Sequence, residues 1–196
     1  MITRDDEKQE IDPFNEFVIN THKALLKERI ILLNGDVKEN IIERMVIPLF
    51  KMNSRDEKKK VTILINSYGG SSEDSQAVID TMLSMKTPIT TKVLGKAMSA
   101  AFDIFMAGDN RVVFQNSLLM MHCGSNHYGM RKLSDVQIEA KLNEELFRRW
   151  AKYYAKRTKI SEQEWYDMIA SGKDIYFFPE EALAKGLAHS IHKHSK

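Results

Sequence analysis

The sequence predicts a single α/β domain with a mainly parallel sheet, and three observations support this class. Short runs rich in Val, Ile and Leu alternate with segments whose apolar residues recur at every third or fourth position. Glycine or proline stands between most of these segments. The 196 residues, of which 43% are hydrophobic, suffice for one domain with a substantial core. Strands that alternate with helices in this way are typical of α/β folds.

The first part of the chain predicts a helix, a strand and a second helix. Residues 1–12 are charged and show no period, so we expect them to be ordered only by a partner. Residues 13–26 carry their apolar side chains on one helical face. Residues 25–33 predict a strand that ends at an Asn-Gly turn. Residues 41–52 predict a helix that kinks or stops at Pro48.

The central part predicts a strand, a helix, a second strand and a second helix. The strand over residues 61–66 ends at a Gly-Gly turn, and the apolar residues of 74–85 have helical spacing. Residues 89–94 predict the next strand. The chain then turns at Gly95 into a helix of small and apolar residues. Ser99 is therefore expected at a strand-to-helix corner.

The next part predicts two more strands and a long helix. The strands cover residues 111–114 and 118–121, and His122 follows the second one directly. Residues 134–158 carry an apolar stripe, and Ser134 opens them in a capping-box pattern. A helix of this length either projects from the body toward another subunit or packs on its own sheet.

Two short helices close the chain. One begins after Ser161, which again fits a cap, and the other begins at Pro179 and is followed by Gly186. Asp174 lies between them in a predicted loop over residues 172–177. A solvated turn residue is the ordinary interpretation of this aspartate, and a member of a catalytic set is the alternative.

Composition excludes several classes of function. With 29 basic and 27 acidic residues the net charge is only +2, so no nucleic-acid partner is expected. The single Cys123 excludes an internal disulfide and fits a reducing compartment. No stretch predicts a membrane span or a secretory signal, so we expect a cytoplasmic protein. The histidines lack an accompanying ligand set, and no metal site is expected.

Ser99 is placed where a nucleophile could be activated. A serine at the start of a helix lies near unpaired backbone N–H groups and the positive end of the helix dipole, which favour an oxyanion. The Gly69-Gly70 turn offers further backbone donors without a blocking side chain. Taken alone, each of these features has an ordinary structural explanation. A double glycine is usually a turn, and a serine among alanines usually allows close helix packing. A histidine such as His122 is often a residue at the edge of the core. Their order along one α/β pattern favours catalysis.

Several short motifs occur in one order along residues 25–191. They are Leu26-Lys27-Glu28-Arg29-Ile30-Ile31, Ile65-Asn66-Ser67 with Gly69-Gly70-Ser71, Asp80-Thr81-Met82, Gly95 with Ala97 and Ser99, Met121-His122, and Asp174 with Pro179-Glu180-Glu181-Ala182. With these motifs the chain resembles the proteolytic subunit of the Clp protease. The resemblance implies a crotonase-type spiral of ββα units with a projecting handle helix. It also implies self-assembly into two stacked heptameric rings that enclose a chamber.

The resemblance assigns roles to five residues of this sequence. Ser99 corresponds to the nucleophile, His122 to the general base and then acid, and Asp174 to the residue that orients the imidazole. The backbone N–H groups of Gly70 and Ala100 correspond to the oxyanion hole. The implied reaction is the cleavage of unfolded proteins or peptides by a serine endopeptidase. No cofactor is implied for this chain, because ATP would be used by a partner AAA+ unfoldase.

The chain also departs from the usual pattern of the family. Tyr68 stands where a proline is usual, and Ala100-Ala101 and Cys123-Gly124 replace Met-Gly and Gln-Pro. Asp103 adds a carboxylate one helical turn after Ser99, where the family has an apolar residue. A negative charge near the serine would oppose an oxyanion.

We divide the chain into a divergent N-terminal segment (1–24), a serine peptidase domain (25–191) and a polar tail (192–196). The N-terminal segment lacks the family's apolar axial loop pattern, which leaves its coupling to an unfoldase open. Two other functions stay open as well. One is a ring subunit with a scaffold or regulatory role and weak catalysis. The other is a crotonase-like enzyme acting on an acyl thioester, although that reaction leaves the three side chains without a role. A Ser/Lys dyad with Lys96 is disfavoured, because this lysine is expected at the surface.

Overall fold

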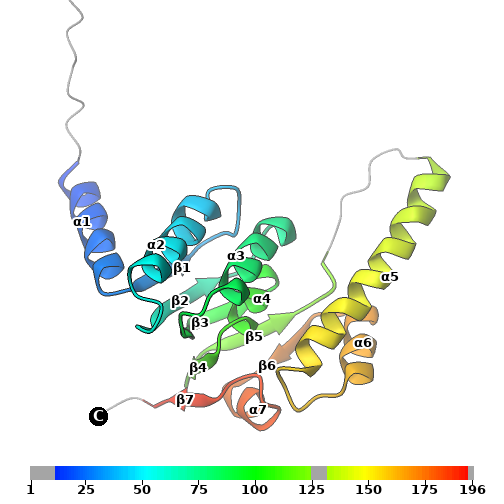
Figure 1. Ribbon diagram of the computed structural model, residues 1–196. Coiled ribbons are helices and arrows are strands. Elements are labelled where there is room, and N and C mark those ends of the chain that lie inside the picture. Colours follow the sequence, from blue (N-terminus) through cyan, green and yellow to red (C-terminus); the bar gives the residue numbers. More distant parts are fainter. Residues whose placement is uncertain (1–11, 125–131, 194–196) are drawn as a thin grey trace, which may run out of the picture.

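A seven-stranded sheet organises the computed structural model, which describes residues 12–124 and 132–193 (Figure 1). Five strands lie in the order β1-β2-β3-β4-β7, and each neighbouring pair among them is parallel. A further strand, β5, pairs in parallel with β3, and β6 pairs antiparallel with β5. The strands are β1 (Ile30–Asn34), β2 (Val61–Ser67), β3 (Ile89–Met98), β4 (Asn110–Phe114), β5 (Leu118–Met121), β6 (Ile175–Phe177) and β7 (Ser190–His192). The predicted α/β class with a mainly parallel sheet is confirmed.

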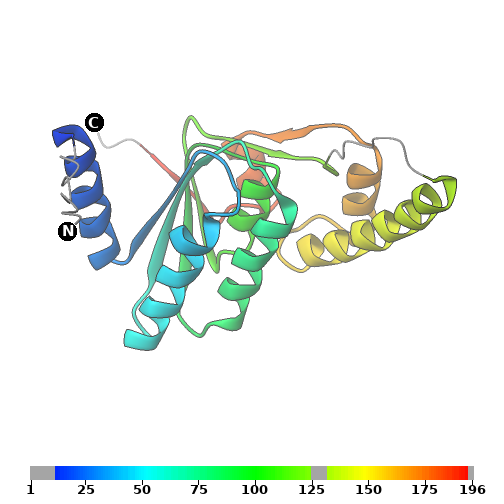
Figure 2. The same ribbon diagram turned by 90° about the horizontal axis from the view of Figure 1, so that it is seen from above.

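Helices cover one face of this sheet, and further helices lie beyond one of its ends. Figure 2 shows α2, α3 and α4 side by side on one face, and α5 with α6 beyond the end of the sheet. The helical elements are α1 (Pro13–Lys27), the π-helix η1 (Ile42–Val46), α2 (Ile47–Arg55), α3 (Ser72–Ser84), α4 (Ala100–Met106), α5 (Leu133–Ala155), α6 (Glu162–Ala170) and α7 (Pro179–Ala184). The first 11 residues of the predicted N-terminal segment, the connector after Gly124 and the end of the tail lie outside the described residues, as do His127 and His194.

The strand β3 is longer than predicted and changes partners at Gly95. Its first part, Thr90 to Val93, pairs with β4, and its last three residues pair with β5. Gly95 separates the two parts with a φ of +86°. The prediction that a helix begins directly after Gly95 is wrong, because hydrogen bonds to β5 keep the chain extended as far as Met98. The sheet therefore branches just before Ser99.

Two predictions near the N-terminus need correction. The strand predicted from residue 25 begins only at Ile30, because α1 continues to Lys27. Leu25 and Leu26 fit the apolar face of a helix as well as a strand, so the pattern alone was ambiguous. The boundary that we set at residue 24 thus falls inside α1. The second helix does not stop at Pro48; the chain passes from η1 into α2 there and continues to Arg55. Pro48 lies in the first turn of α2, directly after the π-helical turns of η1.

Of the two N-terminal caps predicted for the later helices, one is wrong and one is confirmed. The long helix α5 is capped by Lys132 without a side-chain bond, and the Ser134 hydroxyl donates to Asp135 inside the helix. At α6 the predicted capping box is confirmed. Ser161 accepts from the Glu164 backbone N–H, and the Glu164 carboxylate accepts from the Ser161 backbone N–H.

The core beside α4 is aromatic and joins four elements. Phe102 of α4 stacks on Phe177 of β6, with ring centroids 6.3 Å apart. Tyr154 of α5 lies 5.7 Å from Phe102 and 4.8 Å from Trp165 of α6. All four residues are buried. Because such rings bury large apolar areas, this cluster holds α5, α6 and β6 against the helix that begins at Ser99.

The long helix α5 projects from the body along much of its length (Figure 1). Its buried residues, Ala151 and Tyr154, lie in its C-terminal part. Large apolar side chains along the rest of the helix are exposed: Leu133, Val136, Ile138, Leu142 and Leu146. The predicted projecting helix is therefore confirmed, and its apolar stripe is not covered by its own sheet.

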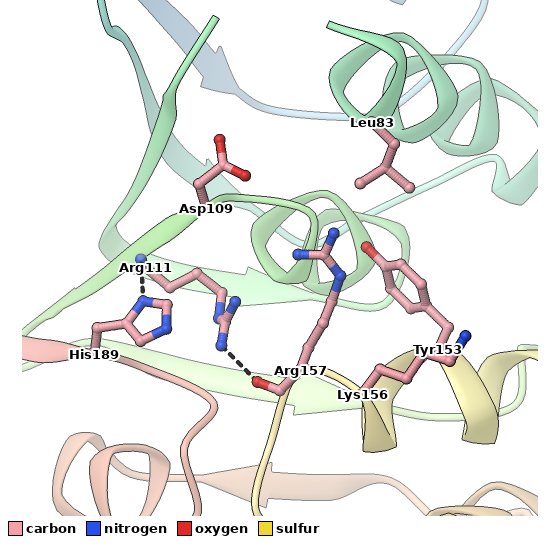
Figure 3. A pocket seen from close by; sticks show the side chains of 7 residues that line it. All are labelled: Leu83, Asp109, Arg111, Tyr153, Lys156, Arg157 and His189. Carbon is pink, nitrogen blue, oxygen red and sulfur yellow. Dashed lines mark hydrogen bonds between the residues drawn. The ribbon is translucent and has the colours of Figure 1, made fainter. Parts of the chain in front are cut away.

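Arg111 of β4 links the C-terminal segment to the sheet through side-chain hydrogen bonds. Its side chain is 3% exposed, and its guanidinium donates to the carbonyls of Leu187 (2.6 Å), Gly186 (3.0 Å), Gly108 (3.1 Å) and Arg157 (2.6 Å). Figure 3 shows the last of these bonds at the edge of a cavity of about 520 Å³. Burial, with a smaller effect from the nearby Arg157, lowers the pKa of Arg111 to about 10.

We expect Arg111→Met to lower the free energy of unfolding by about 3–5 kcal/mol, because it leaves four carbonyls near the core without their donor. For a chain of this size the loss corresponds to a fall in melting temperature of about 10 °C. Thermal unfolding followed by circular dichroism measures it. The matched control is Arg149→Met on the exposed side of α5, where the melting temperature should change by no more than about 2 °C. Equal melting temperatures for both variants would contradict the role of Arg111.

Candidate active site

Ser99 lies at the branch of the sheet, between the end of β3 and the start of α4. Its backbone has φ 52° and ψ −131°, a conformation that L residues rarely adopt. Hydrogen bonds hold it there: the Ser99 N–H donates to the Met120 carbonyl, and its own carbonyl accepts from Phe102 and Asp103. The predicted strand-to-helix corner is confirmed. Backbone strain of this kind is concentrated at functional sites.

The strand register explains why His122 and Asp174 lie together. In the antiparallel pair of β5 and β6, Met121 lies opposite Ile175. One step further along both chains, His122 is opposite Asp174. Directly opposed residues of an antiparallel pair have neighbouring Cβ atoms. The parallel pairing of β3 with β5 in turn brings Ser99 beside this end of β5. The ends of β3, β5 and β6 therefore bring the side chains of Ser99, His122 and Asp174 close together.

The three side chains form a continuous chain of contacts. The Ser99 Oγ lies 2.7 Å from the His122 Nε2, and the His122 Nδ1 lies 3.4 Å from an Asp174 oxygen. A carboxylate beside Nδ1 favours the tautomer that carries its proton there, which leaves Nε2 free to accept from the serine hydroxyl. The Asp174 side chain is 51% exposed and that of His122 24%, so water reaches the carboxylate more easily than the imidazole.

The Gly69-Gly70 turn packs directly against Ser99. A Cβ added to Gly69 would lie 2.7 Å from the Ser99 Cβ, and one added to Gly70 would lie 2.0 Å from the Val37 carbonyl oxygen. Two hydrogen bonds to Val37 fix the turn. Among the described residues, none accepts a hydrogen bond from the backbone N–H of Gly70 or of Ala100. Two backbone donors thus remain available beside the serine hydroxyl.

We expect Gly69→Ala to displace Ser99 from His122, because φ is +103° at this position and the new methyl group would overlap Ser99. Reactivity of Ser99 toward a fluorophosphonate should fall about 100-fold, as misplacement of a reacting group by about 1 Å commonly costs this much. Gly35→Ala is the matched control, since Gly35 also has a positive φ but has no atom within 4 Å of its added Cβ. Equal reactivity in the two variants would show that the close approach of Gly69 is unimportant.

A cavity of about 770 Å³ adjoins the serine. The turn after β2 and the start of α3 form one side, the ends of β3 and β5 another, and α5 the third. Among the residues that line it are Gly70, Ser99, Asp103, His122, Leu142, Leu146, Trp150 and Tyr154. The Lys96 ammonium instead lies over the Tyr68 ring, 3.8 Å from its centroid. The contact partner of the Ser99 hydroxyl is therefore His122 and not a lysine.

Asp103 lies in this cavity one helical turn after Ser99. Its Oδ1 accepts a hydrogen bond of 2.5 Å from the Tyr154 hydroxyl. Burial raises the pKa of Asp103 to about 7, although the bond from Tyr154 lowers it. Burial also raises the pKa of Tyr154 well above its ordinary value, helped by the neighbouring Asp103. Near neutral pH both the charged and the neutral form of the Asp103 carboxyl are therefore populated.

The structure brings together all five residues to which the sequence assigned roles, namely Ser99, His122, Asp174, Gly70 and Ala100. Sequence reasoning had already placed Asp103 near Ser99; the structure adds its partner Tyr154 and the wall formed by α5, neither of which the sequence connected to the site. The apolar stripe of α5 was visible, but the pattern could not show which part of it faces Ser99. Within the described ranges, no three His, Cys, Asp or Glu side chains group closely enough to hold a metal ion. Nor does any described helix have the length and apolar character to cross a membrane.

Comparison with known proteins agrees with this geometry. The family model described as Clp protease matches residues 14–195. The chain is also similar to the "ATP-dependent Clp protease proteolytic subunit" of Deinococcus radiodurans, with 32% identity over 173 residues that cover 87% of this chain and 83% of the relative. The match extends over α1, across the boundary that we drew at residue 24. The chain therefore belongs to the Clp protease family.

Proposed function

We propose that this protein is a serine endopeptidase that cuts unfolded proteins or peptides. The observation that supports this most strongly is the contact chain from the Ser99 Oγ through the His122 imidazole to Asp174. A serine hydroxyl is too weakly acidic to attack an amide unaided, so a base within hydrogen-bond distance is required. A crotonase-like reaction on a thioester would leave this contact chain without a role.

Each step of the reaction follows from these contacts. The Ser99 Oγ attacks the substrate carbonyl carbon while its proton passes to the His122 Nε2. The C–N bond then breaks, the amine leaves with the proton from Nε2, and an ester with Ser99 remains. A water molecule attacks this ester and gives its proton to Nε2. The C–O bond breaks, the acid leaves, and the Ser99 Oγ recovers its proton. Asp174 keeps the imidazole oriented and stabilises its charged form.

The negative oxygen that forms on the substrate carbonyl needs donors. We assign this role to the backbone N–H groups of Gly70 and Ala100, for which no described residue is an acceptor. Ala100 is the first residue of α4, where the helix dipole adds positive potential. Loss of one such donor typically costs about 3 kcal/mol in the transition state.

We further propose that the chain assembles into two stacked heptameric rings and works with an ATP-dependent unfoldase in the cytoplasm. The name of the Deinococcus relative describes a proteolytic subunit of an ATP-dependent protease. The exposed apolar stripe of α5, together with Phe14, Phe17 and Val18 on α1, supplies surfaces that association could bury. The free Cys123 fits a reducing compartment. No cofactor is proposed for this chain, since ATP would be hydrolysed by the partner.

Intact-mass analysis after incubation with a fluorophosphonate tests the function, and native mass on the same sample tests the assembly. We expect one adduct on each chain, located at Ser99, and a particle of fourteen chains. A ring that forms no adduct would exclude the peptidase and favour a scaffold subunit. An adduct on a monomer would retain the serine mechanism and refute the ring.

A further inference from the structure

The cavity beside Ser99 combines carboxylates with an apolar, aromatic wall. Asp103 lies on its inner side, and Glu73 and Glu139 also line it. Its described lining contains no lysine or arginine. Leu142, Leu146 and the other α5 residues supply the apolar surface. A long cationic side chain matches both parts of the cavity, because its charge can lie beside the Asp103 carboxylate while its aliphatic stem lies along the apolar wall.

We propose that this cavity selects substrates with lysine or arginine on the acyl side of the cleaved bond, with Asp103 as the specificity-determining residue. The proposal rests on the proposed peptidase function and names its substrate class. The residue whose carbonyl lies between the Gly70 and Ala100 N–H groups is the one closest to Ser99. Its side chain is therefore the one that enters the adjoining cavity.

The distance from Ser99 to Asp103 suits such a side chain. The two residues are four positions apart, and the Asp103 N–H donates to the Ser99 carbonyl. At about 1.5 Å per residue, four positions give about 6 Å along the helix axis, and both residues line the same cavity. A lysine or arginine extending along α4 from the serine would thus bring its charge to the carboxylate.

The environment of Asp103 leaves one oxygen for a ligand. Oδ1 accepts from the Tyr154 hydroxyl, which fixes the carboxylate, and no described residue donates to Oδ2. The Trp150 ring stacks on that of Tyr154 with centroids 5.5 Å apart and also lines the cavity. An ammonium or guanidinium group can therefore pair with Oδ2, while its aliphatic stem lies against Trp150 and Leu146.

The preference should depend on pH because burial raises the pKa of Asp103 to about 7. The other groups around it are Ser99, the His122 imidazole at the end of β5, Glu73 of α3, and Tyr154 with Glu139 of α5. As the pH rises from 6 to 8, the charged fraction of Asp103 increases about tenfold, whereas a substrate lysine stays charged. Any effect of pH on the cleavage chemistry itself is common to both substrates. It cancels when kcat/KM for a lysine substrate is divided by kcat/KM for a leucine substrate.

The test uses two fluorogenic peptides, acetyl-Leu-Leu-Lys-aminomethylcoumarin and its counterpart with a third leucine in place of lysine. For the wild-type protein at pH 8 we expect kcat/KM at least tenfold higher for the lysine peptide, with a ratio that falls toward pH 6. Asp103→Asn should lower kcat/KM for the lysine peptide about 10- to 100-fold and change that for the leucine peptide less than about threefold. Glu145→Gln, on α5 but outside the cavity, should change neither.

The outcomes separate this proposal from the proposed function. Suppose that the fluorophosphonate adduct forms but the wild-type protein prefers the leucine peptide, or that Asp103→Asn lowers kcat/KM equally for both peptides. Either result would overturn the assignment of Asp103 and leave the peptidase function standing. If no adduct forms, the preference is measured as binding of acetyl-Leu-Leu-Lys and acetyl-Leu-Leu-Leu by tryptophan fluorescence, since Trp150 lines the cavity. Tighter binding of the lysine peptide by tenfold supports the cation site, and equal binding overturns it.

Discussion

Ser99→Ala is expected to lower kcat for peptide cleavage by at least about 10⁴-fold, because removal of the nucleophile leaves only the backbone donors and substrate binding. The fold should be retained. Alanine keeps the Cβ at a position where φ is 52°, and the backbone hydrogen bonds of residue 99 do not involve the hydroxyl. What is lost is one hydrogen bond to His122, worth about 1 kcal/mol. Steady-state kinetics with a fluorogenic peptide and thermal unfolding measure the two effects.

A second serine controls for the loss of a hydroxyl. Ser54 of α2 donates to the Lys51 carbonyl on an exposed helix surface away from the cavity. Ser54→Ala should keep full activity and full labelling by the fluorophosphonate. If Ser99→Ala cleaved the peptide as fast as Ser54→Ala, the serine mechanism would have to be abandoned, whatever the state of assembly.

Asp174→Asn is expected to have the second largest effect, a fall in kcat of between about 10² and 10⁴ with little change in KM. An amide opposite the His122 Nδ1 can donate to it, which favours the tautomer that places the proton on Nε2. That nitrogen could then no longer accept the Ser99 proton. The carboxylate is 51% exposed, and water can replace part of its effect, so the lower end of the range is included.

Asp167→Asn is the matched control for this change. Asp167 lies on the exposed surface of α6 and accepts from Gln163, so its replacement should leave kcat unaltered. Both variants are compared by steady-state kinetics over a range of pH, together with circular dichroism to confirm the fold. A value of kcat within threefold of the wild type for Asp174→Asn would remove this aspartate from the mechanism and leave a Ser-His pair.

The positions that the sequence predicted well are those where local pattern and local geometry agree. The strand over 118–121 was predicted with its observed bounds, and the capping box at Ser161 was predicted as it occurs, because each depends on residues close in sequence. Errors arose where a pattern fitted two structures. Leu25 and Leu26 suit a helix or a strand, and Ser134 resembles a cap but lies inside α5.

The sequence by itself determined the class of the fold and the corner at Ser99, and through motif resemblance it supplied the residues for which we propose catalytic roles. It could not determine what brings these residues together. Strand β6 was predicted as a loop, because its three residues carry no pattern of their own and become a strand only by pairing with β5. That pairing sets His122 opposite Asp174.

Only the tertiary structure decided what the added carboxylate at Asp103 faces. In the sequence it is one charge after Ser99, which could be exposed or paired. In the fold, α5 returns from residues far along the chain and brings the Tyr154 hydroxyl and the Trp150 ring beside it. The physical reason is that the charge and access of a buried carboxyl depend on desolvation and on partners from distant segments, which no local period encodes.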